Sequence, residues 1–187
     1  MKSSAKAALW IAFYLFMIFS PLIIILVAPR PAGREFWREF AVGLGFIGLS
    51  LMGLQFVPTA RLPFLCCVFP MDTVYFLHHA TSVASLAFVL AHPLILLFDN
   101  PNIAQFFNPA VTPWRVLSGV IAAALAFLLV ASSVYRKSLN FIYEPWRMTH
   151  GILSVIVLVL SLIHIFQVNH YTAMPLQRAL WIVLPVL

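Results

Sequence analysis

Residues 73–98 read TVYFLHHATSVASLAFVLAHPLILLF, and residues 146–168 read WRMTHGILSVIVLVLSLIHIFQV. Each stretch is long and apolar enough for a helix that crosses the hydrocarbon core of a bilayer, which takes about 20 residues. Ionisable side chains at membrane depth are costly and mark function by default. Each stretch carries two of them fourteen residues apart: His78 and His92, then His150 and His164. These two stretches decide the fold class and locate the candidate site.

The composition is that of an integral membrane protein. Of 187 residues, 63% are hydrophobic and only 9% are charged, and the mean hydropathy is +1.02. A soluble domain carries about 25% charged residues. So few charges cannot cover the surface of a water-soluble globule, which excludes a cytosolic enzyme, a nucleic-acid binder and a disordered chain. The lipid bilayer is therefore the first predicted partner, and no nucleic acid is expected.

Five complete membrane spans and the start of a sixth are predicted. They cover about residues 8–28, 40–57, 73–98, 114–134 and 146–168, and the sixth begins near Met174 and is still apolar at Leu187. The apolar core of the first span, about 20 residues, exceeds the 7–15 of a secretory signal, so we interpret it as an uncleaved helix. Residues 99–113 are predicted to form an external loop. The fold class is thus an all-α membrane protein, a six-transmembrane-helix bundle whose last helix is truncated.

Basic residues orient the bundle. The side of the N-terminus would carry six of them, and the other side five: Lys2, Lys6, Arg61, Arg136, Lys137 and Arg147, against Arg30, Arg34, Arg38, Arg115 and Arg178. The positive-inside rule then predicts a cytoplasmic N-terminus. The two cysteines, Cys66 and Cys67, are adjacent and give neither a disulfide framework nor a spaced zinc pattern.

The spacing of the histidines predicts two levels of paired imidazoles. Fourteen residues make just under four helical turns, so each pair lies on one face to within about 40°, with a rise of about 21 Å. The third and fifth helices run in the same direction, which sets His78 level with His150 (the first level) and His92 level with His164 (the second level). Two facing imidazoles are the axial ligands of a six-coordinate b-type haem. The sequence therefore predicts two stacked haems between helices 3 and 5.

Neighbouring residues bear on this assignment, and alternatives remain. Small residues on the two histidine faces would leave room for a macrocycle: Thr81, Ser82 and Ser85, then Ser154 and Ser161, with Val157 between them. Pro93 should bend the helix beside His92. His79 is rotated by roughly 140° from the His92 face, so we prefer His78 as the ligand. Ordinary helix packing, tetrahedral zinc and a proton relay are the other interpretations of membrane histidines.

The histidine motifs resemble a known family. The segments Phe76-Leu77-His78-His79, Ala91-His92-Pro93, Tyr143 to His150 and Leu162-Ile163-His164 resemble the ferric reductase-like transmembrane domain. That superfamily includes NADPH oxidases, ferric-chelate reductases and the haem subunit of bacterial methionine sulfoxide reductase. The resemblance runs roughly from the second span to the end of the chain. It implies two haem b groups, the inner one on His78 and His150 and the outer one on His92 and His164.

The resemblance also implies how such a domain is used. Electrons would pass from NAD(P)H to FAD in a C-terminal cytosolic module after residue 187, or in a partner protein, and then through both haems to an external acceptor. Arg147, three residues before His150, is the preferred partner for a haem propionate. Other cations suit the inner haem (Arg61, Arg136 and Lys137) or the outer one (Arg115 and Arg178). The family commonly has Arg or Lys where this chain has His79.

Several functions follow as hypotheses. The first is an oxidoreductase domain in a bacterial inner membrane that delivers electrons to oxygen or ferric iron. The second is a haem-bearing membrane subunit that serves a separate periplasmic reductase. From other classes come a metal-ion transporter and a structural subunit whose histidines only join helices.

Overall fold

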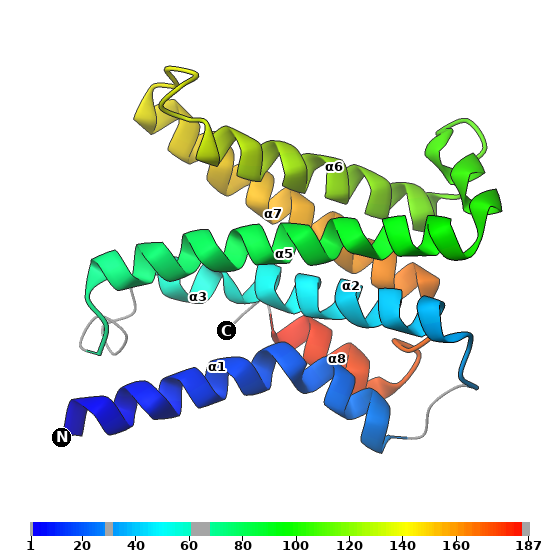
Figure 1. Cartoon of the computed structure of the whole chain (residues 1–187), viewed down its shortest axis with the longest axis horizontal. Helices are drawn as coiled ribbons and strands as arrows, with labels where there is room; N and C mark the ends of the chain where they lie inside the picture. The colour runs from blue at the N-terminus through cyan, green and yellow to red at the C-terminus, as the bar shows by residue number, and fades with distance from the viewer. Residues whose placement is uncertain (1, 29–31, 61–67, 185–187) are drawn as a thin grey trace.

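The computed structural model describes residues 2–28, 32–60 and 68–184, which are helical throughout apart from their connections and contain no strand (Figure 1). The predicted residues Arg61, Cys66 and Cys67 lie outside these ranges. The elements are α1 (Lys2–Val27), α2 (Phe36–Leu54), α3 (Phe56–Thr59), α5 (Met71–Asp99), the 3-10 helix η1 (Pro101–Phe107), α6 (Trp114–Val134), α7 (Tyr143–Val168) and α8 (Pro175–Val183).

Five helical segments are long and apolar enough to cross a membrane, and they confirm the five complete spans predicted. They are Ala5–Val27, Phe36–Thr59, Met71–Asp99, Trp114–Val134 and Tyr143–Val168. The sixth predicted span corresponds to α8, which has nine residues in the described part of the chain. Nine residues are too few to cross a bilayer. The protein is therefore a multi-pass membrane protein with five spanning helices among the described residues.

The helices associate in pairs. The most extensive contacts join α2 to α5 and α6 to α7, while α1 packs against α2 and α8 (Figure 1). We call the end of the bundle where α5 and α7 begin the Met71 end, and the end where α6 begins the Trp114 end. The helices α5 and α7 run in the same direction, as predicted, and each rests on its own antiparallel partner.

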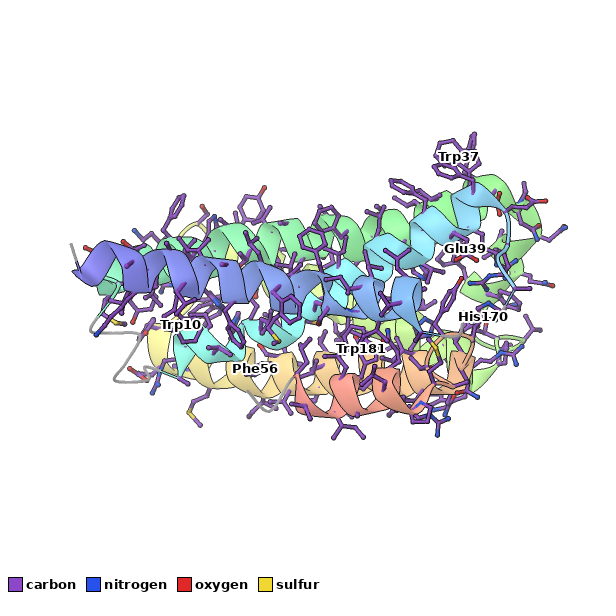
Figure 2. The ribbon with its side chains drawn as sticks, turned by 90° about the horizontal axis from the view of Figure 1, so that it is seen from below. Trp10, Trp37, Glu39, Phe56, His170 and Trp181 are labelled. Atoms are coloured by element: carbon purple, nitrogen blue, oxygen red, sulfur yellow. The ribbon has the colours of Figure 1, made fainter. Side chains whose placement is uncertain are left out.

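The short helix α8 is part of the core. Trp181 and Leu184 are almost completely buried, and Trp181 packs among Phe46, Leu49 and Leu158 from α2 and α7 (Figure 2). Large apolar side chains elsewhere on the spanning helices are exposed, for example Leu9 on α1 and Ile152 on α7. That distribution suits a bundle whose outer surface contacts lipid.

A kink in α1 is tied to α8. Pro21 lies inside the helix and has no N–H, so the carbonyl of Met17 loses its helical donor. The Ser20 hydroxyl donates to that carbonyl at 2.8 Å. The side-chain amide of Gln177 donates to the Pro21 carbonyl at 3.4 Å. The helix bends in its second half (Figure 1), and polar groups from α1 and α8 occupy the bend.

A polar cluster holds the loop after α7 against the start of α2, at the Trp114 end. The Tyr171 hydroxyl donates to the Glu39 carboxylate, which also accepts from the Arg34 side chain at 3.0 Å. The Arg34 guanidinium lies 5.6 Å from the centre of the Tyr171 ring. Burial and the bond to Glu39 both raise the pKa of Tyr171. Glu39 and His170 lie at the same end of the molecule (Figure 2).

Removing the Tyr171 hydroxyl should weaken this end of the bundle. Tyr171→Phe keeps the ring beside Phe46 but deletes the donor to Glu39. Since Glu39 is partly exposed, we expect a loss of about 1 kcal/mol in the free energy of unfolding. The measurement is the thermal unfolding midpoint in detergent, with Tyr135→Phe at an exposed position as the control. Equal midpoints for the two variants would contradict the prediction.

Candidate functional site

The structure brings the four predicted histidines together in two pairs. The ring centroids of His78 and His150 are 6.4 Å apart, and those of His92 and His164 are 6.5 Å apart. The first pair lies towards the Met71 end and the second towards the Trp114 end. Each level therefore has one imidazole from α5 facing one from α7.

At the second level, both histidines hydrogen-bond to backbone carbonyls of a neighbouring helix. His92 Nδ1 lies 2.8 Å from the Ala41 carbonyl oxygen, and His164 Nδ1 lies 2.6 Å from that of Arg115. A carbonyl only accepts, so each Nδ1 carries the proton and donates it. Each Nε2 is then left with its lone pair, which is the state that binds a metal ion.

A glycine gives each of these rings room to reach its carbonyl. Ala41 precedes Gly45 by one turn of α2, and Arg115 precedes Gly119 by one turn of α6. A Cβ on Gly45 would lie 3.3 Å from the His92 ring, and one on Gly119 would lie 2.7 Å from His164 Nδ1. The two helix pairs thus hold their second-level histidines in the same way.

The first level is held more weakly. The Ser133 hydroxyl donates to the Leu129 carbonyl at 2.7 Å, and its oxygen lies 3.2 Å from His150 Nδ1, from which it accepts. His78 Nδ1 is buried and has no hydrogen-bond partner in the described part of the chain. Near His78 the second span is interrupted at Gln55, whose amide donates to the Thr81 hydroxyl at 2.8 Å.

The ring spacing fits two axial ligands on one metal ion. An imidazole nitrogen binds a metal at about 2.0 Å and lies about 1.1 Å from its ring centre, so two rings on opposite sides of one ion have centres about 6.2 Å apart. Both observed distances agree with that value. No group of three or more His, Cys, Asp or Glu that could hold a metal occurs within the described ranges. Two ligands per level suit haem, whose macrocycle supplies the other four nitrogens.

The small residues predicted on the histidine faces make two kinds of hydrogen bond. The Ser85 hydroxyl donates to the Gly48 carbonyl of α2 at 2.8 Å, and Thr81 accepts from Gln55, so both face the α2–α3 side. The remaining serines, Ser82, Ser154 and Ser161, bond to carbonyls of their own helices. Thr81 and Ser85 therefore join helices rather than line the space between α5 and α7.

Arg147 is already paired. Its guanidinium donates twice to the Glu144 carboxylate, at 3.0 and 3.2 Å, and both side chains are more than 60% exposed. Its predicted role towards a propionate stays a prediction. Arg115 contributes its carbonyl to His164, and Arg178 bonds to Thr172 and Asn169 in the loop after α7.

Sequence reasoning missed Trp146, whose ring centre lies 5.1 Å from that of His150. Its place four residues before His150, on the same face of α7, was the available signal. Of the other two histidines, His79 is exposed and belongs to neither pair. His170 packs its ring on Tyr171, and burial, followed by the nearby charge of Arg34, lowers its pKa.

Comparisons with known proteins bear on the family of the chain. A family model described as "Ferric reductase like transmembrane component" matches residues 44–161, more than half of the chain, and includes His78, His92 and His150. An uncharacterized protein of Archaeoglobus fulgidus is 24% identical over 112 residues. That alignment covers 54% of this chain, which spans 58% of the length of the relative. No solved structure matches.

Filling the space beside His164 should disturb the second level alone. In Gly119→Ala the new methyl group would overlap the His164 ring, so the ring must move away from the Arg115 carbonyl. If the two levels hold haem, we expect about one b haem per chain in place of about two, measured as the pyridine haemochrome. Gly43→Ala is the matched control, because its Cβ would meet only Leu22 at 3.9 Å. Full haem content in Gly119→Ala would contradict this role of the glycine.

Proposed function

Because the chain belongs to the ferric reductase-like transmembrane family, as its histidine motifs predicted, we propose that it conducts electrons across the membrane through two b haems. His78 and His150 would hold one haem, and His92 and His164 the other. The observation that carries the proposal is the facing of the rings at 6.4 and 6.5 Å, the spacing of two axial ligands. When bound, each haem iron supplies one-electron chemistry between its ferric and ferrous states.

The residues around the histidines orient the ligands. The Ala41 and Arg115 carbonyls accept the Nδ1 protons of His92 and His164, which directs each Nε2 away from α2 and α6 and towards the opposite histidine. Such bonds also raise the basicity of the imidazole. At the first level, Ser133 performs this role for His150.

The donor and the acceptor complete the proposal. We place the Met71 end in the cytoplasm of a bacterial cell, in line with the cytoplasmic N-terminus predicted from the basic residues. The donor would be a module with FAD and NAD(P)H, either in the same polypeptide or in a partner protein. The acceptor beyond the Trp114 end would be oxygen or ferric iron.

Optical spectroscopy and a transport assay test the function directly. The purified protein should show a Soret band that shifts on reduction with dithionite, with split low-spin α and β bands. Vesicles that contain the protein and are loaded with ferricyanide should lose ferricyanide when an impermeant reductant is added outside. A colourless protein defeats the proposal, and a coloured protein that leaves ferricyanide intact defeats transmembrane conduction.

Single replacements of the histidines should separate the two levels. His92→Ala or His164→Ala should leave about one b haem per chain, and so should His78→Ala or His150→Ala, with distinct spectra for the two groups. His79→Ala and His170→Ala are the controls and should keep both haems, because neither side chain belongs to a facing pair. Normal haem content in His150→Ala, or equal loss in His79→Ala and His78→Ala, would refute the assignment.

A further inference from the structure

The indole of Trp146 leaves a buried donor without an acceptor beside the first-level pair. Trp146 lies one turn of α7 before His150, displaced towards the Met71 end, and the two ring planes are inclined by 39°. Its Nε1 atom is buried and has no hydrogen-bond partner among the residues that the structure describes. A buried donor left unpaired is destabilising, because it has lost its hydrogen bond to water. A hydrogen-bond acceptor beside Trp146 Nε1 would therefore stabilise the site.

A cation lies next to the same donor. The Arg136 guanidinium is 5.4 Å from the ring centres of both Trp146 and Tyr143, so it stacks on these two rings. Its one hydrogen bond to a described residue is a long contact of 3.4 Å with the Phe141 carbonyl. Neither of the two ion pairs in the described ranges includes Arg136. A guanidinium presents five N–H donors in a fixed fork that matches a carboxylate.

Arg147, unlike Arg136, already has a carboxylate partner and lies at the surface. Its carboxylate partner is Glu144, and the pair is exposed at the surface. Near His150, at the Met71 end, Arg136 and Trp146 are therefore the side chains that can bind an anion, rather than Arg147. The described protein supplies no carboxylate to them.

We propose that Trp146 Nε1 and the Arg136 guanidinium bind a propionate carboxylate of the first-level haem, which orients the propionate edge towards the Met71 end. The inference rests on the proposed function and identifies two positioning residues for its cofactor. The orientation follows from the position of Trp146, which lies on the face of α7 that bears His150, between His150 and the Met71 end of the bundle. A propionate held there would satisfy the indole donor and neutralise the guanidinium together.

The proposal predicts an effect on one haem only. A cation beside a haem favours the reduced state, which carries one positive charge fewer, so removing it should lower the midpoint potential. In the His164→Ala background, which should keep only the first-level haem, Arg136→Gln should lower that potential. Trp146→Phe keeps a ring beside His150 but removes the donor, and haem transfer to apomyoglobin should become roughly tenfold faster. Arg147→Gln is the matched control and should change neither quantity.

Esterified haem separates the explanations. When the protein is reconstituted with haem dimethyl ester, which offers no carboxylate, the rates of haem transfer from Arg136→Gln and Trp146→Phe should match that of their parent. Differences that persist would mean that these residues act on the His150 ring, and a shift in Arg147→Gln alone would mean that Arg147 binds the propionate. Either result overturns the inference while the proposed function stands. A wild-type protein without haem would instead defeat the proposed function.

Discussion

The arrangement depends on the hydrogen bonds from His92 and His164 to the Ala41 and Arg115 carbonyls. Without such an acceptor, nothing fixes which nitrogen of an imidazole on a membrane helix is turned across the bundle. With it, Nδ1 is protonated and turned to the partner helix, and Nε2 keeps its lone pair. The pairing of α5 with α2 and of α7 with α6 thus holds the two histidine-bearing helices beside the carbonyls that accept from their rings. Gly45 and Gly119 permit the close approach that these bonds require.

The two levels differ in what surrounds their ligands. At the second level both rings bond to carbonyls that are fixed within helices, so the orientation of each ligand is set by backbone atoms. At the first level His150 has a hydroxyl partner at 3.2 Å and His78 Nδ1 has none in the described chain, while Arg136 and Trp146 lie on the His150 side. If the two levels hold haem as we propose, imidazole basicity would be the main influence on the potential of the second-level haem, and local charge the main influence on that of the first.

Sequence alone predicts those features that depend on one helix at a time. The five complete spans follow from hydropathy, and the common face of each histidine pair follows from 3.6 residues per turn. Features that depend on a second helix were not predictable: that Ser85 bonds to Gly48, or that Gly119 lies under His164. The short helix α8 shows the same limit. Its nine residues do not form a span, yet Trp181 is wholly buried because α1, α2 and α7 surround it.

The difference between the levels corresponds to a difference between α6 and the α2–α3 segment. On α6, Gly119 and Ser133 are separated by fourteen residues, which is also the interval between His150 and His164. The unbroken antiparallel helix α6 therefore has Gly119 beside His164 and Ser133 beside His150. The same interval from Gly45 leads to Thr59, which lies beyond the interruption at Gln55. There the Thr59 hydroxyl donates to the Gln55 and Phe56 carbonyls of its own turn, at 3.1 and 3.0 Å. His78 Nδ1 accordingly has no counterpart of Ser133 in the described part of the chain.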